Sequence, residues 1–600
     1  MGVPRLTRLL RPYATESQSL RGTSVVVDGP AFCYHAYHIC LSARWKARNQ
    51  FEAAISYAEV GRVAIAWLDA LRLSGVSIRH IYFDGYLPAS KYETRISRIV
   101  KHTDKLLSYH TAYPITPYSA APAHQDGNFV EVIGRHSVPD RLTKLPPVPF
   151  LVPAILECLK TSVAYKDITK VVPGEADVYC AESIRDATGI VLTGDSDLLV
   201  HNIGRESSVL FFGDIERDTD DQLEGLRALV YCPTRIATRL GLPDLYALAF
   251  ELTSDITVSF PQLLERAKSL ATSVGSSDKY EDFQNEYVGM TSPMPRDESG
   301  ILGVLFSMDP RISEYVLQFP YIAKIAGYDL QFDSASTSHV FLPFLFDNPI
   351  RTNAWEISRS VRQLAYGLVN LVVPAGESKC TVFEHKRQQS KSGGRELQIL
   401  DPSKLLDACE ALLTILNEMS AKLPDCSQEE IWQAVGVYQD VDWHISNSKE
   451  VLGSLVRHQV LMLEDKQNQN LSWDILQYSA QLDGSYYSFR ILKQITLLTT
   501  SLKPDLPPLI LTLNQRLQSL PPIEVVKSFS HIVPTIKMIK QKGMAKVAHE
   551  VFGVALVEVS AKPQMSRRDA KRKRKADRAH SGLANSDQKA SNPFDVLSIE

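Results

Sequence analysis

The chain has 600 residues, of which 44% are hydrophobic and 22% are charged, and its formal net charge is −3. This composition is that of an ordinary globular protein and excludes a collagen, a coiled-coil rod and a wholly disordered chain. The charge is unevenly placed, with +7 in residues 562–580 and −2 in residues 581–600, which leaves −8 for the first 561 residues. The total argues against a strongly basic nucleic-acid coat protein, but the local basic segment does not.

The cysteines and the apolar runs indicate the compartment. The eight cysteines include no CxxC pair, so a disulfide scaffold, a zinc ribbon and a thioredoxin motif are excluded and a reduced intracellular compartment is expected. No run of about 18 apolar residues occurs, so no transmembrane helix is expected and no membrane is counted among the expected partners. The start MGVPRL is not typical of a secretory signal, and Leu6 stands where a myristoylation motif requires Ser or Thr.

Strand and helix patterns alternate through about residue 215. The predicted strands are 23–28, 78–84, 170–172, 189–192 and 208–212. The predicted helices are 32–41, 52–74, 89–110, 151–163 and 173–187. Seven prolines in residues 111–150 predict an extended insertion between two of these helices. The alternation predicts an α/β fold with a mostly parallel sheet.

The rest of the chain is predicted to be mainly α-helical. The clearest periodic segments are 237–252, 315–325, 355–371, 403–419, 452–463 and 488–499. No repeat period is evident. We therefore predict an α/β domain over 1–257, a large mainly α-helical region over 258–560 and a disordered basic tail over 561–600.

Acidic residues follow the predicted strands, at the edge where parallel sheets bind ligands. They are Asp28, Asp84, Glu175, Asp177, Asp195 and Asp197, with Asp255 further along. A single Asp at a strand end is usually a loop residue, but six carboxylates at one edge would repel each other unless cations offset their charge. No His or Cys accompanies them at ligand spacing, and oxygen ligands alone suit Mg²⁺ or Mn²⁺. Two such ions about 4 Å apart can support phosphodiester hydrolysis.

The motifs around these acids resemble, in the same order, those of the flap endonuclease/XPG nucleases, which are PIN-like. They are MGVPRLTRLLRPYA at the start, VVVDGPAFCY (25–34), IYFDG (81–85), GEADVYCA (174–181), TGDSDLLV (193–200) and LTSDIT (252–257). The resemblance covers roughly residues 1–257 and implies a PIN-like core, with XPG N and I regions, whose seven acids hold two Mg²⁺ ions, or Mn²⁺. The long helical region and basic tail look more like the Asteroid branch of the superfamily.

The resemblance also implies residues that contact the substrate. Lys91 and Arg98 match the basic pair that contacts the scissile phosphate in this family. With Arg95 and Lys105 they share one face of the predicted helix, which is either a phosphate-contacting stripe or a solvated face. Tyr34 matches an aromatic residue that stacks on a base, and a core tyrosine is its alternative.

Gly2 matches the family's second residue, where an N-terminus without a side chain approaches the active site and DNA. Its basic neighbours Arg5, Arg8 and Arg11 are interpreted as solvated or phosphate-touching. Two departures stand out: Asp177 replaces the usual Glu, and VSFPQLLERAK follows Asp255 where the family has a Gly-x-Gly turn that binds duplex DNA. The family's sliding-clamp peptide is not evident.

Other catalytic classes lack their motifs. Pro30 stands at the second position after Asp28, where an aspartyl-phosphatase needs Asp, and neither a P-loop nor a nucleophile elbow occurs. The tail holds a basic cluster that predicts a nuclear location, with a nucleic-acid patch, a solvated charge run and a cytoplasmic location left open. The cluster is Arg567, Arg568, Lys571, Arg572, Lys573, Arg574 and Lys575. The last residues, 592–600, are a weak match to a docking peptide.

The sequence therefore predicts a Mg²⁺-dependent, structure-specific endonuclease that cuts branched or flapped DNA, or RNA, by a two-metal mechanism, as in DNA repair. Its expected partner is DNA with junctions between single and double strands, and its protein partners are unknown. The alternative is a non-catalytic nucleic-acid-binding regulatory scaffold on a nuclease fold. Retention of the whole acid set favours the enzyme, because an abandoned metal site has no reason to keep mutually repelling carboxylates.

Overall fold

A computed structural model describes residues 2–16, 19–119, 131–218, 225–255, 257–272, 278–288, 300–328, 330, 337–461 and 468–556. Residues 1–556 form one compact unit, and residues 557–600 form a second unit that lies outside the described residues. The basic cluster of residues 567–575 and the segment 592–600 belong to that second unit, so their assignments stay predictions. None of the described helices has the length and apolar character that crossing a membrane requires.

The central sheet has five parallel strands in the order β5-β3-β2-β6-β7. They are β2 (Ser24–Asp28), β3 (Ser77–Asp84), β5 (Thr169–Val172), β6 (Ile190–Thr193) and β7 (Ser208–Phe211). Each lies within one residue of a predicted strand, which confirms the α/β prediction. Because β2 lies between β3 and β6, the carboxyl ends of these three strands are adjacent.

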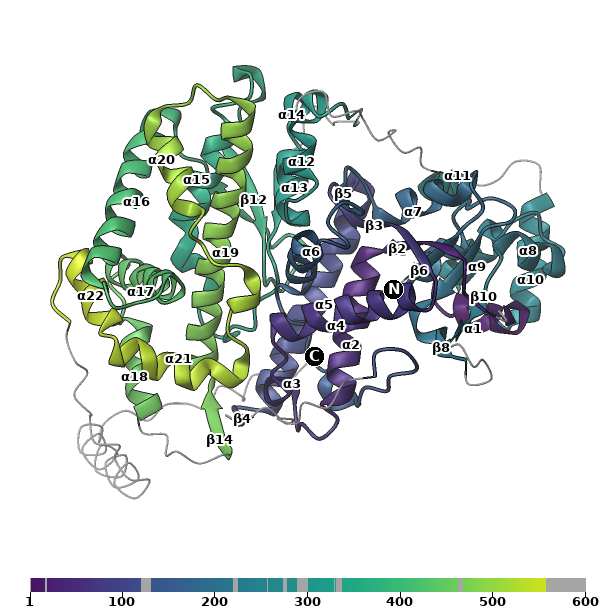
Figure 1. Ribbon diagram of the computed structural model, residues 1–600, viewed down its shortest axis with the longest axis horizontal. Helices are drawn as coiled ribbons and strands as arrows, with labels where there is room; N and C mark the ends of the chain where they lie inside the picture. Colours follow the sequence, from purple (N-terminus) through teal and green to yellow (C-terminus); the bar gives the residue numbers. More distant parts are fainter. Residues whose placement is uncertain are drawn as a thin grey trace, which may run out of the picture. The chain divides into compact units, whose positions relative to one another are not determined.

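Helices cover both faces of this sheet (Figure 1). Val25 and Val27 of β2 point into one hydrophobic core, while Val26 points into the other. The first core is closed by α2 (Gly29–Ala43), α4 (Tyr57–Leu73) and α6 (Leu151–Thr161). The second is closed by α7 (Ala176–Arg185), α8 (Pro233–Leu240) and α9 (Tyr246–Ser254). Burial on both faces explains why β2 is a continuous apolar run rather than an alternating one.

Two predicted helices are divided in the structure. The helix predicted over 52–74 is divided into α3 (Gln50–Ala53) and α4 by Ala54, whose backbone is left-handed. The helix predicted over 237–252 is two helices, α8 and α9, because Gly241 ends α8 in the left-handed conformation at φ 70° and Pro243 follows. After α9 come α10 (Phe260–Thr272) and α11 (Asp278–Val288).

The predicted insertion 111–150 is partly ordered. Its strand β4 (Ile115–Ser119) pairs antiparallel with β14 (Asn468–Ser472), and a short 3₁₀ turn covers Asp140–Leu142. Strand β1 (Thr15–Glu16) pairs with β10 (Leu229–Val230), and β8 (Glu216–Arg217) pairs with β9 (Leu226–Arg227). Strands β4 and β14 show that the insertion contacts a segment more than 300 residues away in the chain.

The later part of the chain is mainly helical, as predicted. Its helices are α12 (Leu302–Leu305), α13 (Pro310–Val316), α14 (Pro320–Ile325), α15 (Arg359–Val369), α16 (Pro402–Lys422), α17 (Gln428–Ser446), α18 (Leu452–Leu461), α19 (Trp473–Leu502), α20 (Pro508–Leu517), α21 (Ile532–Gln541) and α22 (Met544–Phe552). Sequence analysis missed α17, although Ser427 and Glu430 form a capping box at its start. It also missed the sheet of β11 (Ser338–Phe341), β12 (Thr381–His385) and β13 (Arg395–Gln398). The boundary at residue 257 stays a prediction.

Candidate active site at the carboxyl edge of the sheet

Asp28 is the most buried of the predicted acids, with 3% of its surface exposed at the end of β2. Its carboxylate accepts hydrogen bonds from the backbone N–H of Ala31 at 3.2 Å and from Thr193 Oγ1 at 2.6 Å. Thr193 ends β6 and also accepts from the N–H of Asp195 at 2.9 Å, and Asp195 accepts from the N–H of Asp197 at 3.2 Å. These bonds connect the carboxyl ends of two neighbouring strands.

The end of β3 and the start of α7 bring three more acids to the same edge. Asp84 ends β3, and its Oδ1 accepts a hydrogen bond from the N–H of Ala176 at 2.8 Å. Glu175 immediately precedes α7, and Asp177 lies in its first turn. One hydrogen bond therefore joins the β3 carboxylate to the helix that carries the other two acids.

The pKa shifts show that these acids share one electrostatic environment. Burial raises the pKa of Asp28 and of Glu175 to about 7 and that of Asp197 to about 6. Burial also raises the pKa of Asp177 well above its usual range. The carboxylates that raise the pKa of Asp177 further are Asp28, Asp195, Asp84 and Asp197. Six predicted acids therefore lie near one another.

Asp255 lies outside this group. It follows the last residue of α9, and its Oδ1 accepts hydrogen bonds from the N–H and Oγ1 of Thr257 at 3.0 and 2.6 Å. The guanidinium of Arg266 lies 3.9 Å from its other oxygen. The Thr257 hydrogen bonds lower the pKa of Asp255, opposite in direction to the shifts of the buried acids. The structure does not place it among the converging carboxylates.

The N-terminal backbone lies against the turn that carries Asp195 and Asp197. The N–H of Val3 donates to Asp197 Oδ1 at 2.9 Å, and Ser196 Oγ donates to the carbonyl of Val3 at 3.1 Å. Gly2 has a φ of 94°, and a Cβ at this position would overlap the carboxylate of Asp195 and lie 2.5 Å from Ser196 Oγ. Only glycine therefore allows the chain to approach the acids this closely.

Lys91 lies beside the acids and is held by two of them. It ends the 3₁₀ turn Ala89–Lys91 before α5 (Tyr92–Ala112), and its Nζ lies 3.6 Å from Glu175 and 2.5 Å from Glu286. Burial lowers the pKa of Lys91, but Glu175 and Glu286 outweigh this effect, so the pKa is raised overall. Sequence analysis missed Glu286, because nothing in the pattern of α11 places it beside Lys91.

A second residue of α11 also reaches this edge. The ring of Tyr287 packs against His201, with 5.1 Å between their centroids. Burial and the charge of Asp197 both raise the pKa of Tyr287. Helix α11 therefore places a carboxylate on Lys91 and a phenol near Asp197.

The predicted basic stripe of α5 is exposed only in part. Arg98 and Lys105 are exposed, as a phosphate-contacting stripe requires. Arg95 is only 7% exposed, donates to Glu314 of α13 at 2.7 Å and lies 3.5 Å from the ring centre of Phe341. Its guanidinium holds α5 against α13 and is largely covered in this structure, so its assignment as a nucleic-acid-binding residue stays a prediction that the burial disfavours.

Tyr34 and Arg311 lie next to the acid group. Tyr34 is a half-buried residue of α2 whose pKa is raised by burial and lowered by the charges of Arg311 and Arg98. Arg311, in the first turn of α13, also lowers the pKa of Asp84, although burial raises it overall. Its side chain is 41% exposed. Sequence analysis missed Arg311 because its helix lies more than 200 residues after β3.

The acid group offers several oxygen donors of the kind that bind metal ions. Among the described residues, no three His, Cys, Asp or Glu side chains lie close enough together to hold a metal ion as they stand. The donors present are nevertheless carboxylate oxygens, which suit Mg²⁺ and Mn²⁺. A cation would also favour the ionised forms that burial and mutual repulsion now disfavour. The chemistry of the donors therefore suits a hard divalent cation, although the described side chains are not yet arranged around one.

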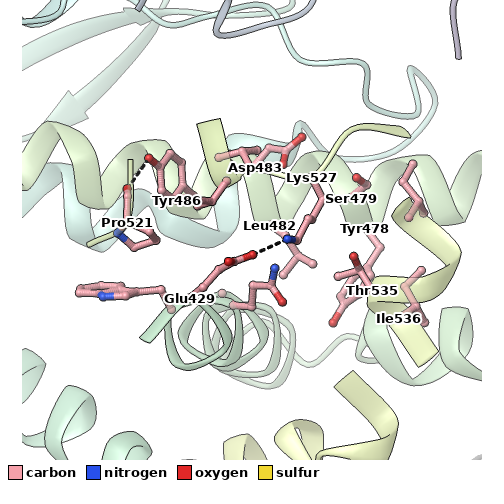
Figure 2. A pocket seen from close by; sticks show the side chains of 16 residues that line it. Glu429, Tyr478, Ser479, Leu482, Asp483, Tyr486, Pro521, Lys527, Thr535 and Ile536 are labelled. Atoms are coloured by element: carbon pink, nitrogen blue, oxygen red, sulfur yellow. Dashed lines mark hydrogen bonds and ion pairs between the residues drawn. The ribbon is translucent and has the colours of Figure 1, made fainter. Parts of the chain in front are cut away.

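A separate cavity of about 80 Å³ lies in the helical region, lined by residues of α17, α19 and α21 (Figure 2). An ion pair of 2.5 Å between Lys527 and Glu429 contributes to its lining. Asp483 also lines it, and burial raises the pKa of this carboxyl to about 7. None of the predicted acids lines this cavity.

Residues 147–399 match the family model of XPG domain-containing proteins. The parallel sheet with helices on both faces is consistent with an α/β PIN-like core, and this match supports a nuclease-type fold similar to that of XPG domain-containing proteins. The matched range holds β5, α7, β6 and β7 with four of the converging acids, and it continues through α13. None of the curated proteins matches this chain. The match thus supports the superfamily, and it extends beyond the range over which the sequence motifs are recognised.

Proposed function

We propose that this protein is a divalent-metal-dependent, structure-specific endonuclease that hydrolyses phosphodiester bonds in branched or flapped DNA, or RNA. The observation that carries this proposal is the convergence of six carboxylates beside Lys91 at the carboxyl edge of a parallel sheet. Such an arrangement destabilises the metal-free fold, and it is useful where cations and a phosphate bind together.

Asp28, Asp84, Glu175, Asp177, Asp195 and Asp197 would hold the cations, some of them through waters. When bound, Mg²⁺ or Mn²⁺ would supply Lewis acidity at the scissile phosphate and make a water more acidic. The chain's own hydrogen bonds keep these carboxylates oriented, since Thr193 fixes Asp28 and the N–H of Ala176 fixes Asp84. Asp177 is one methylene shorter than the family's usual Glu, which favours contact through a water.

The basic and aromatic residues would act on the substrate. The ammonium of Lys91, next to Glu175, can exchange its carboxylate partner Glu286 for a phosphate oxygen. The exposed guanidinium of Arg98 can stabilise charge that develops on the same phosphate. Tyr34 presents a ring near both the acids and Arg98, where a base could stack without sequence preference.

The decisive experiment is a cleavage assay with Mg²⁺ or Mn²⁺ on flaps, forks, splayed ends and single strands. Asp195→Ala should abolish cutting while thermal unfolding shows an intact fold. Asp186→Ala, which removes an exposed carboxylate at the other end of α7, is the matched control and should cut normally. Cutting that survives Asp195→Ala would refute the assignment of these acids as the catalytic site.

A non-catalytic nucleic-acid-binding scaffold is the second candidate. It is favoured by the contact of Glu286 with Lys91, which occupies the position proposed for the phosphate. Metal-dependent binding across the whole substrate panel, with no cutting by the wild-type protein, would establish this alternative.

The long helical region supports assignment to an Asteroid-type branch, and the basic cluster 567–575 supports a nuclear location. A fluorescent fusion that lacks residues 562–580 should lose nuclear accumulation. Equal distribution of the full and shortened proteins would contradict this location.

A further inference from the structure

An open hollow of about 820 Å³ lies beside the acid site. Gly2, Gly194 and Ser196 form the side next to Asp195, since Gly194 and Ser196 flank this acid in the chain and Gly2 lies against it. Four arginines also line the hollow, together with one acid, Asp214. The arginines are Arg5, Arg8, Arg11 and Arg135.

Three of these arginines, Arg8, Arg11 and Arg135, present exposed guanidinium groups to an anionic ligand, while Arg5 is half-buried and donates to the carbonyl of Val258 at 3.4 Å. Arg8 is exposed and forms no ion pair within the described part of the chain. Arg11 is 44% exposed and lies 2.9 Å from Asp214, while Arg135 is 65% exposed and lies 2.9 Å from Glu216. The pair of Arg135 with Glu216 is exposed and contributes little stability, whereas the carboxylate of Asp214 is only 10% exposed. Both guanidinium groups keep exposed surface that phosphate oxygens can reach. The hollow therefore carries an excess of positive charge beside a strongly acidic site.

We propose that this hollow binds the phosphodiester backbone of the strand that enters or leaves the acid site. The proposal deepens the proposed function, because it assigns a path to the substrate that the acid site would cut. Besides the guanidinium groups and backbone, the hollow is lined by Pro4, Thr7 and the carboxylate of Asp214. The aromatic ring that lines it, Phe211, is only 8% exposed. Binding should therefore depend on phosphates rather than on base identity.

The spacing of the arginines favours a strand over a single phosphate. Arg5, Arg8 and Arg11 recur every three residues through α1 (Leu6–Leu10) and the 3₁₀ turn Arg11–Tyr13. At the helical rise of about 1.5 Å per residue, they extend over about 9 Å. Successive phosphates of one strand can occupy that length.

The test measures binding to the full-length protein without cleavage. A labelled splayed duplex is titrated in EDTA at several KCl concentrations, and the dissociation constant is read from fluorescence anisotropy. The test variant is Arg8→Gln with Arg11→Gln, and the matched control is Arg235→Gln. Arg235 is 68% exposed on α8, pairs with Glu206 at 3.0 Å and does not line the hollow. It therefore matches the paired arginine in charge, although Glu206 is 65% exposed and Asp214 is 10% exposed.

The double variant should bind about three- to tenfold more weakly near 0.1 M salt. The slope of log affinity against log salt concentration should also be smaller in magnitude by about 1.4, if two contacts to single-strand phosphates are lost. Arg235→Gln should change neither quantity, and Arg8→Lys with Arg11→Lys should restore much of the salt dependence. Thermal unfolding confirms that each variant folds, and Arg8→Gln alone replaces the double variant if that one does not.

Two results would overturn the proposal. One is an unchanged salt slope and affinity in the double variant. The other is displacement of the duplex by inorganic phosphate as readily as by an unlabelled oligonucleotide, which would indicate a site for a small anion. Cleavage is scored separately with Mg²⁺. If the variants show the expected loss of binding but the wild-type protein cuts nothing, the proposed strand path stands and only the endonuclease function is refuted.

Discussion

Replacing Glu286 by Gln should tighten nucleic-acid binding. Glu286 now holds Lys91 Nζ at 2.5 Å, while Glu175 lies further away at 3.6 Å. A phosphate that binds Lys91 must first displace the Glu286 carboxylate, so removing this competitor removes part of the cost of binding. Gln keeps the size of the side chain and loses only its charge.

The size of the effect follows from the exposure of the pair. Lys91 is 26% exposed and Glu286 is 39% exposed, so the pair is partly screened by water. Pairs of this kind are worth about 0.2–1 kcal/mol, which corresponds to a gain in affinity of up to about fivefold. Helix α11 should stay in place, because Tyr280 and Phe283 pack against Phe250 of α9 at 5.2 and 5.5 Å.

The assay compares the dissociation constants of a labelled splayed duplex in EDTA at low salt. Asp282→Asn is the matched control, because it removes the same charge from an exposed position of the same helix. A gain for Glu286→Gln that clearly exceeds the gain for Asp282→Asn supports direct competition at Lys91. Equal gains in affinity for the two variants would mean that the effect is general charge repulsion. Weaker binding by Glu286→Gln would refute competition between Glu286 and the phosphate for Lys91.

Three further predictions concern stability. Asp177→Asn should raise the free energy of unfolding without divalent cations by about 1–3 kcal/mol, because it removes a buried carboxylate that its neighbours repel. Denaturant unfolding should also show that Mg²⁺ stabilises this variant less than the wild type. A lower stability of the variant without metal would contradict the electrostatic account. Glu314→Ala should cost about 3–5 kcal/mol, since it leaves the buried guanidinium of Arg95 unpaired; a loss below 1 kcal/mol in urea melts would argue against the pair. The pKa of Asp483 is raised from an ordinary value near 4 to about 7, so its contribution is full below about pH 4, declines as pH rises to about 7 and then levels off. Between pH 5 and pH 8 the wild type should therefore lose about 2–4 kcal/mol more stability than Asp483→Asn, and parallel pH profiles of the two proteins would disprove the assignment.

The strands and the acids that follow them could be read from local patterns. A run such as residues 25–27 is apolar at every position because both faces of its strand are covered, and this pattern needs no partner to be recognised. The general rule that parallel strands meet at one carboxyl edge then placed Asp28, Asp84 and Asp195 together. Gly241 and Pro243 are local signals that end a helix, so the sequence does contain the break in the helix predicted over 237–252. The apolar periodicity on both sides of these residues outweighed the two signals.

Other features depend on contacts between distant parts of the chain. Arg95 has the helical spacing of a phosphate-contacting residue. Its guanidinium is nevertheless buried and paired with Glu314, which belongs to another helix, α13. Asp255 fits a family motif, but Thr257 and Arg266 engage its carboxylate apart from the converging acids. Strands β11 and β12 are short and pair across more than 40 residues, so neither shows a strong pattern by itself.

The sequence by itself determined the parallel sheet and the set of acids at its edge, because a strand's burial and its terminal residue are encoded within a few positions. Only the tertiary structure decided which charges face those acids. Glu286 on Lys91, Arg311 near Asp84 and the arginine-lined hollow beside Gly2 each join segments far apart in the chain. Electrostatic forces depend on distance in space, and the folding of α11, α13 and the N-terminus sets those distances.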